Sequence, residues 1–243
     1  MAEYLEPHGS WKTYNQFFAR HTKPGCRPIA DIEDSRIITS PADATFDGSW
    51  EVRGDDTIEI KGIHWKISEL LEGSPYKDRF AGGKWMHSFL GPADYHRQHA
   101  PVGGRVLESR DIMGDVYLEV TAVPDPATGR NRLEAKRVNT FDAPDHPGYE
   151  FMQNRGLVVL DSPIGLVAVL PMGMGQVSSV IMTAEVGKVL RKGEEISYFQ
   201  FGGSDIVMVF EAACNVNFTA RPGVHYKVGT KIGEAYPTIY PAR

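Results

Sequence analysis

Hydrophobic and polar positions alternate over short stretches along most of this chain, and turn residues separate the stretches. From Gly156 onward apolar runs recur at short intervals, and the 25 glycines and 16 prolines of the chain leave few segments long enough for a helix. Short apolar runs bounded by glycine and proline are typical of strands. The pattern therefore predicts an α+β fold that is predominantly β, with an antiparallel sandwich or barrel core and a few short helices.

The second half of the chain carries the clearest strand pattern, with a spacing that suits a sandwich or barrel. Segments 184–196 and 221–233 share a sequence pattern of glycine, valine, basic residue and glycine. This pattern indicates strand–turn–strand units like those of lipoyl barrels. A lipoyl or biotinyl carrier needs an exposed lysine at a hairpin tip, and Lys188 and Lys227 lack that setting. The expected strands are Leu157–Leu160, Gly165–Leu170, Gln176–Ile181, Ile196–Phe201 and Ile206–Phe210, with a closing pair around Val224 and Ile232.

The first half of the chain has fewer clear periodic patterns, and two of them are helical in spacing. The expected helices are Tyr14–Ala19 and Lys66–Glu72, and the expected strands are Arg36–Ser40, Ile58–Lys61 and Val116–Val120. A turn is expected at Asp47 and Gly48. The segment Pro124–Gly148 is expected to be a connection and a candidate lid.

Composition and charge exclude several classes of protein. A net charge of -5 disfavours nucleic acid as a partner, because phosphate binding needs a concentrated excess of Lys and Arg. Cys26 and Cys214 are too few for a disulfide framework. A membrane-spanning helix needs about 20 apolar residues, and no such run occurs. We expect a single domain over residues 1–243 in the cytoplasm, without a transmembrane segment and with peripheral membrane contact allowed.

The run Gly202-Gly203-Ser204-Asp205 is the first candidate for chemistry. Glycines beside a serine usually mark a turn. Here, however, strand-like runs precede and follow them, so the serine lies where a sheet backbone is expected to bend sharply. Glycine permits backbone conformations closed to other residues, and a strained peptide bond is a starting point for backbone cleavage.

Two further segments carry candidate side chains. His96 and His99 lie three residues apart beside a proline, and Asp43 follows an expected strand. Neither His64 nor His87 adds a third metal ligand at a usual spacing, so we expect no metal here. Taken alone, the histidine pair also fits a structural role, and Asp43 also fits a solvated turn.

Taken in their order along the chain, the aspartate, histidine and glycine–serine segments resemble the phosphatidylserine decarboxylase family. The resemblance extends over almost the whole chain. The histidine motif is the most distinctive of the five matches. The matching segments are Tyr14–Arg20 with Lys23–Ile29, Ser40–Asp43, Ile60–Gly62 with Ile67–Leu71, Phe89–Val102, and Val189–Ser204 continuing into Ile206–Glu211.

The resemblance implies that Ser204 attacks the carbonyl of Gly203, and that the resulting ester eliminates and hydrolyses to leave a pyruvoyl group on residue 204. The chain would become fragments 1–203 and 204–243. His99 is then the base and Asp43 the carboxylate that orients it, as in a Ser-His-Asp triad. The pyruvoyl carbonyl would form a Schiff base with a primary amine and accept electrons as CO2 leaves. His96 would assist decarboxylation or reprotonation, and a homodimer is expected.

The sequence departs from the family pattern at three places. Ala44 replaces a usual glycine, Asp205 a common threonine, and Asn154-Arg155-Gly156 only approximates the family's run. None of these removes a nucleophile, base or acid. The expected substrate is the phosphatidylserine headgroup, and the alternative is a free aromatic amino acid such as tryptophan. A hypothesis of a different functional class is a non-catalytic binding protein, an unprocessed barrel that binds a ligand without chemistry.

Overall fold

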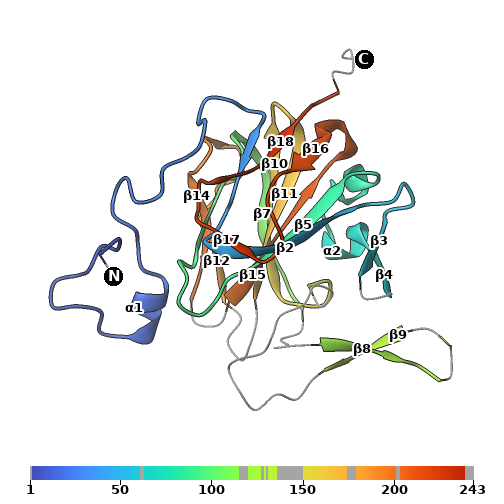
Figure 1. The fold of residues 1–243 in the computed structure, drawn as a ribbon, viewed down its shortest axis with the longest axis horizontal. Coiled ribbons are helices and arrows are strands. Elements are labelled where there is room, and N and C mark those ends of the chain that lie inside the picture. Colours follow the sequence, from blue (N-terminus) through green and yellow to red (C-terminus); the bar gives the residue numbers. More distant parts are fainter. Residues whose placement is uncertain are drawn as a thin grey trace.

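The computed structural model describes residues 2–60, 63–114, 120–126, 129, 131–135, 150–173, 179–200 and 203–238. Within these residues the chain is mainly antiparallel β-structure, which confirms the predicted fold class (Figure 1). The described strands form open sheets rather than a closed barrel. No helix among the described residues has both the length and the apolar character needed to cross a bilayer.

One large antiparallel sheet dominates the molecule, and two small sheets, two hairpins and short helices surround it. The large sheet runs in the order β13 (Val189–Leu190), β7 (Gly104–Ile112), β10 (Arg155–Ser162), β11 (Gly165–Gly173), β15 (Gly203–Phe210), β5 (Lys84–Phe89), β2 (Ala44–Glu51) and β17 (Val224–Tyr226). The small sheets are β1 (Ile37–Thr39), β18 (Lys231–Ala235) and β16 (Val216–Phe218), and β12 (Val180–Met182), β14 (Glu195–Phe199) and β6 (Arg97–His99).

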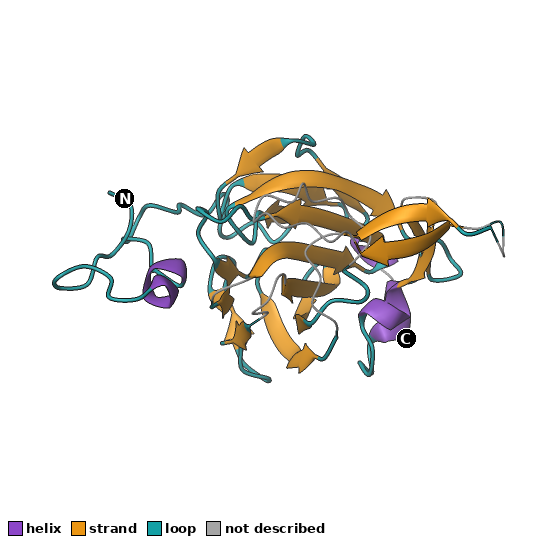
Figure 2. Ribbon diagram, turned by 90° about the horizontal axis from the view of Figure 1, so that it is seen from below, coloured by secondary structure: helices purple, strands orange, loops and turns teal. Residues whose placement is uncertain are grey.

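The remaining elements lie at the margins of this framework. The N-terminal arm, which carries α1, extends to one side of the strands (Figures 1 and 2). The hairpins are β3 (Thr57–Ile60) with β4 (Ile63–Lys66) and β8 (Val120–Pro124) with β9 (Asn131–Ala135), and the helices are α1 (Tyr14–Phe18), α2 (Ile67–Leu70), η1 (Lys77–Phe80) and η2 (Ala212–Cys214).

The large sheet is buried on both faces, which explains why its central strands are almost continuously apolar. Alternate side chains of β15 enter two different cores. Ile206 belongs to a core that also holds Ile38 and Phe199 from the small sheets. Val207 belongs to a second core with Leu70 of α2. The chemistry of the two faces can therefore differ at neighbouring positions of β15.

The two small sheets are equivalent units, as their shared sequence pattern suggests. Each contains a glycine in the left-handed region, Gly193 at φ 86° and Gly229 at φ 84°. The amide of Gly193 donates to the carbonyl of Ala100, and that of Gly229 donates to the carbonyl of Ser40. Each predicted strand–turn–strand segment is present, although its two strands belong to different sheets.

Two sequence predictions about local structure are wrong. Asp47 and Gly48 do not form a turn, because β2 continues through them with a register shift opposite Ser88 and His87. The closing pair of strands, β17 and β18, do not pair with each other, since β17 pairs with β2 and β18 with β1.

The predicted connection Pro124–Gly148 begins with regular structure. Its residues 131–135 form β9, which pairs with β8. Residues 136–149, and all but Val120 of the expected strand Val116–Val120, lie outside the described residues. The suggested lid role stays a prediction.

Candidate active site

The candidate residues lie around one end of three neighbouring strands. Thr45 of β2 is opposite Phe89 of β5, and Phe89 is opposite Asp205 of β15. Asp43 immediately precedes β2, the histidine motif follows β5, and Gly203 begins β15. The register of β2, β5 and β15 therefore places the aspartate, histidine and glycine–serine segments at the same end of the sheet. Ser204 lies within β15, and its side chain is outside what the structure describes.

Backbone hydrogen bonds join the aspartate segment directly to the histidine segment. The amide of Thr39 donates to the carbonyl of Pro101 over 3.1 Å, and the amide of His99 donates to the carbonyl of Pro41 over 2.8 Å. These two bonds fix β1 beside β6. As a result Asp43 and His99, 56 residues apart in sequence, lie in one region of the fold.

Asp43 is buried and is held by a cation rather than by a histidine. Arg27 donates from Nε to Oδ1 over 2.9 Å and from Nη2 to Oδ2 over 2.5 Å, and the amide of Val228 donates to Oδ1 over 2.9 Å. The guanidinium also reaches Glu3 on the N-terminal arm over 2.9 Å. Burial beside a bidentate arginine keeps the carboxylate in a fixed orientation.

His99 is oriented by a backbone carbonyl and a tyrosine. Its Nδ1 lies 2.7 Å from the carbonyl oxygen of Gly193, which accepts only from a protonated Nδ1, and its Nε2 lies 3.1 Å from the hydroxyl of Tyr95. Nε2 therefore carries the lone pair. Burial lowers the pKa of this imidazole, although the hydrogen bond to Gly193 and the charges of Glu195 and Asp43 act in the opposite direction. The ring is thus a neutral base at ordinary pH.

The triad geometry implied by the resemblance is only partly present. Among the hydrogen bonds of the described residues, those of Asp43 go to Arg27 and Val228, and those of the His99 ring go to Gly193 and Tyr95. Asp43 acts on His99 through charge rather than contact. The roles of base and orienting acid stay predictions.

His96 is fully buried and is enclosed by aromatic rings. Phe18 stacks on it at a centroid distance of 3.7 Å, and Phe199 packs edge-on at 6.3 Å. Burial lowers the pKa of His96 to about 3, a backbone group of Asp94 opposes this shift, and the charge of Arg20 adds to it. Neither ring nitrogen forms a well-aligned hydrogen bond within the described residues.

Comparison with known proteins agrees with this arrangement. Residues 14–234 match the family model described as phosphatidylserine decarboxylase, so the match includes all three motifs. The chain belongs to the phosphatidylserine decarboxylase family. The region matched extends from α1 to β18 and so takes in both small sheets as well as the large one.

Three relatives illustrate the range of this family. The chain is 34% identical to phosphatidylserine decarboxylase proenzyme 3 of Schizosaccharomyces pombe over 87% of its own length and 20% of that protein. It is 29% identical to phosphatidylserine decarboxylase proenzyme of Anaeromyxobacter sp. (strain K), covering 93% of this chain and 79% of the relative. It is 29% identical to decarboxylase iboD of Amanita muscaria, covering 93% and 66%. The chain thus spans only a fifth of the yeast relative.

Two departures from the phosphatidylserine decarboxylase pattern are structural. Ala44 is buried in the core beneath the small sheets. Arg155 is buried and donates to the carbonyls of Glu69 and Leu70 at the end of α2, over 3.0 and 2.8 Å. Burial lowers the pKa of Arg155 to about 10. Both residues therefore support the framework rather than the family's chemistry.

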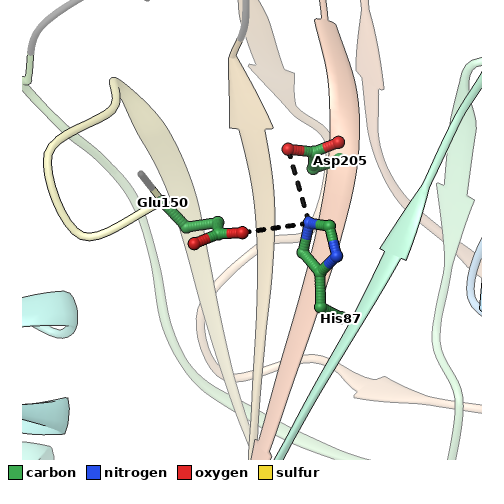
Figure 3. A group of neighbouring side chains, drawn as sticks. All are labelled: His87, Glu150 and Asp205. Carbon is green, nitrogen blue, oxygen red and sulfur yellow. Dashed lines mark ion pairs between the residues drawn. The ribbon is translucent and has the colours of Figure 1, made fainter. Parts of the chain in front are cut away.

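The third departure, Asp205, belongs to a buried cluster on the face of β15 that points away from the small sheets. His87 Nε2 lies 3.1 Å from Glu150 Oε1 and 3.5 Å from Asp205 Oδ2, and all three side chains are fully buried (Figure 3). His87 Nδ1 lies 2.6 Å from Asp47 Oδ2. Imidazole and carboxylate are donors that hold divalent metals, so this group is the candidate metal centre of the described residues.

Sequence reasoning assigned no role to Arg27, Tyr95 or Phe18, although all three lie inside the matching segments. Arg27 and Phe18 are in the N-terminal segment, and Tyr95 directly precedes His96. Their position in the motifs was a usable signal. No sequence signal pointed to Glu150, because its partners are fixed by strand pairing alone.

Proposed function

We propose that this chain is a self-processing, pyruvoyl-dependent decarboxylase that acts on phosphatidylserine. The observation that carries the proposal is the neutral, half-buried imidazole of His99 at the end of the sheet where the Gly203–Ser204 bond lies. Family membership supplies the class of reaction. The relatives named as proenzymes support a processing step.

The processing step needs a base near the serine hydroxyl. His99 Nε2 takes the hydroxyl proton of Ser204, the oxygen attacks the carbonyl carbon of Gly203, and the amide nitrogen leaves to give an ester between the two residues. Elimination then releases fragment 1–203 as a carboxylate, and hydrolysis of the remaining dehydroalanine releases ammonia and leaves the pyruvoyl group. Tyr95 holds Nε2 in place before the proton moves.

The local structure fits such a group at position 204. The register of β15 against β11 shifts between Met172 and Gly173, next to Gly203. Residue 204 has the parity of Ile206, which faces the core that holds Phe18 and Phe199. Alternation in a strand thus favours a pyruvoyl group on the face of the two histidines. When formed, this group supplies the electron sink for loss of CO2.

The roles of the chain's own residues follow from their surroundings. His96 is neutral because burial lowers its pKa to about 3, so it offers a hydrogen-bond donor and acceptor rather than a charge. The rings of Phe18 and Phe199 fix its plane and exclude water from it. We assign to His96 the positioning of the substrate carboxylate through a hydrogen bond.

Phosphatidylserine is the preferred substrate because the relatives of known name include phosphatidylserine decarboxylases from several groups of organisms. A free amino acid is the second candidate, supported by the match to decarboxylase iboD. A pocket of about 540 Å³ between the N-terminal arm and β14 is a candidate entry to the site. It is lined in part by Trp11, Arg20, Arg97, Tyr198 and Gln200.

Release of CO2 tests both the reaction and the substrate. Purified protein should release CO2 from phosphatidylserine in mixed vesicles, and Ser204→Ala should release none. Tryptophan, tyrosine and phenylalanine are the parallel substrates. Release from an amino acid but not from vesicles would replace the lipid by the second candidate, and no release from any of the four would contradict a decarboxylase.

A further inference from the structure

The cluster of His87, Glu150 and Asp205 is not used by the proposed reaction. His87 is in β5, Asp205 is in β15, and Glu150 precedes β10. The side chains of Val207 and Trp85, two positions away along the same strands, lie in the second core, on the side of the large sheet away from the small sheets. The cluster is therefore separated by the sheet from His96 and His99.

The distances around His87 differ on its two sides. On the Nδ1 side, Asp47 lies at 2.6 Å, which is the length of a strong charge-assisted hydrogen bond. On the Nε2 side, Glu150 lies at 3.1 Å and Asp205 at 3.5 Å. Charge-assisted N–H···O contacts are usually about 2.7–2.9 Å long. The second pair of contacts is longer than ion pairs of that kind.

The distance of 3.5 Å from His87 Nε2 to Asp205 matches that between two ligands of one metal ion, and the distance of 3.1 Å to Glu150 is slightly shorter. Ligand atoms that each lie about 2.0–2.2 Å from a tetrahedral zinc ion are roughly 3.3–3.6 Å apart. The three donor atoms all lie within 4.8 Å of one another. A divalent cation among them would also offset two buried carboxylate charges, which are costly in an apolar interior.

The surroundings of His87 are those of a metal ligand. A metal-binding histidine usually donates its other ring N–H to a carboxylate, which fixes the ring and directs the second nitrogen at the metal. Asp47 is placed for this role by the bulge in β2 that puts Gly48 opposite His87. The ring of Trp85 lies parallel to the imidazole at a centroid distance of 5.9 Å.

We propose that His87, Glu150 and Asp205 bind one divalent transition-metal ion such as Zn²⁺, with Asp47 orienting His87. The site is structural, since it lies across the sheet from the candidate catalytic histidines. If the chain is cut before Ser204, as the proposed function requires, the ion joins His87 and Glu150 of the upstream fragment to Asp205 of the downstream fragment. The ion then holds the start of the downstream fragment in place, because Asp205 is the residue next to the pyruvoyl group at position 204.

Metal content of the uncut Ser204→Ala chain tests the site without depending on cleavage. Protein purified without chelator should contain about one metal ion per chain by elemental analysis. After stripping with a chelator, added Zn²⁺ should raise the melting temperature and bind at one equivalent. His87→Gln and the nearly isosteric Glu150→Gln should each lose this ion. His225→Gln, which removes an exposed histidine paired with Asp94 at 3.0 Å, is the control and should keep it.

Absence of metal from the purified chain, together with no binding or stabilisation by Zn²⁺, Mn²⁺ or Mg²⁺ after stripping, would overturn the site and leave the cluster as ion pairs. Retention of the ion by both His87→Gln and Glu150→Gln, or its loss in His225→Gln, would also overturn it. These results leave the proposed function untouched. Conversely, a wild-type chain that holds the ion but is never cut contradicts the proposed function alone.

Discussion

The two histidines of the candidate site are neutral and are held in different ways, and His96 is fully buried whereas His99 is half-buried. His99 is fixed by hydrogen bonds to Gly193 and Tyr95, whereas His96 is fixed by stacking on Phe18. A base held by hydrogen bonds keeps its lone pair in a defined direction, and a stacked ring keeps its nitrogens open to a ligand. We therefore assign the processing step to His99 and the substrate to His96.

Alanine variants should separate these two roles. His99→Ala should stay uncut, because no other base is assigned to Ser204. His96→Ala should be cut but release no CO2, because the pyruvoyl group forms without it. Gel electrophoresis under denaturing conditions reads the first effect and CO2 release the second. Normal cutting of His99→Ala would show that another group is the base.

Burial of His96 should make stability depend on pH. The folded chain keeps His96 neutral down to about pH 3, whereas the unfolded chain binds a proton near pH 6.5. The contribution of neutral His96 to the free energy of unfolding is fully present above pH 6.5 and is lost as the pH falls from 6.5 toward 3. Between pH 7 and 5 the loss is about 2 kcal/mol for this group.

Urea unfolding of the uncut Ser204→Ala chain at the two pH values measures this dependence. Replacement of His96 by Gln should remove about that share of the loss. Replacement of the exposed His64 by Gln is the control and should leave the loss unchanged. An equal pH dependence with and without His96 would contradict the neutral, buried state of its ring.

The ion pair of Arg27 with Asp43 should be important for stability. Both side chains are buried, so Arg27→Met leaves an unpaired carboxylate in the interior and should cost about 3–5 kcal/mol. Arg36→Met, which breaks an exposed pair with Asp34, should cost less than about 1 kcal/mol. Urea unfolding of the uncut chain compares them, and similar costs would show that the buried pair has no special weight.

Among the individual site residues, the sequence predicted which ones gather but not their partners. Asp43 and His99 were found from motif resemblance, and backbone hydrogen bonds join the segments that carry them. Arg27 as the partner of Asp43 was not predicted, because bonding between side chains depends on the path of the chain between them. The group of His87 and Asp205 was missed for the same reason, since they face each other only through strand register.

Among the elements, strands with uninterrupted apolar runs were predicted, whereas several strands whose apolar pattern is interrupted by polar side chains were not. β10 and β11 were recognised from their apolar stretches. β5 and β2 were missed, because His87 and Asp47 interrupt the apolar pattern and make it look like a loop. In the structure these polar residues are paired with one another inside the sheet. Two of the missed strands, β5 and β2, thus carry His87 and Asp47 of the candidate metal centre, and β7 was missed as well.

The strand pairing also predicts the behaviour of the cut protein. β15 lies between β11 and β5 in the centre of the large sheet, and β18 pairs with β1. The fragment 204–243 should therefore stay bound to fragment 1–203 without a covalent link. Both fragments should elute together from a sizing column in native buffer and separate only in denaturant. Separation in native buffer would contradict the pairing of β15 within the sheet.

As a whole, the molecule consists of a large sheet with two equivalent small sheets on one face. The segment between β1 and β2 supplies Asp43, β6 supplies His99, and the large sheet supplies the start of β15. The general β architecture followed from the spacing of apolar runs and the likeness of the two units from their shared sequence pattern, whereas their matching hydrogen bonds are seen only in the structure. Assignment of the chain to the phosphatidylserine decarboxylase family connects this architecture to one reaction.

The intact mass of the purified wild-type chain tests the central claim most directly. The account predicts that the 27.0 kDa chain is replaced by two fragments, one ending at Gly203 and one beginning at residue 204 with the mass of a pyruvoyl group. Hydroxylamine should add to the second fragment only. A chain that stays at full mass after long incubation, with no carbonyl that hydroxylamine can trap, would contradict self-processing and favour a binding protein without this chemistry.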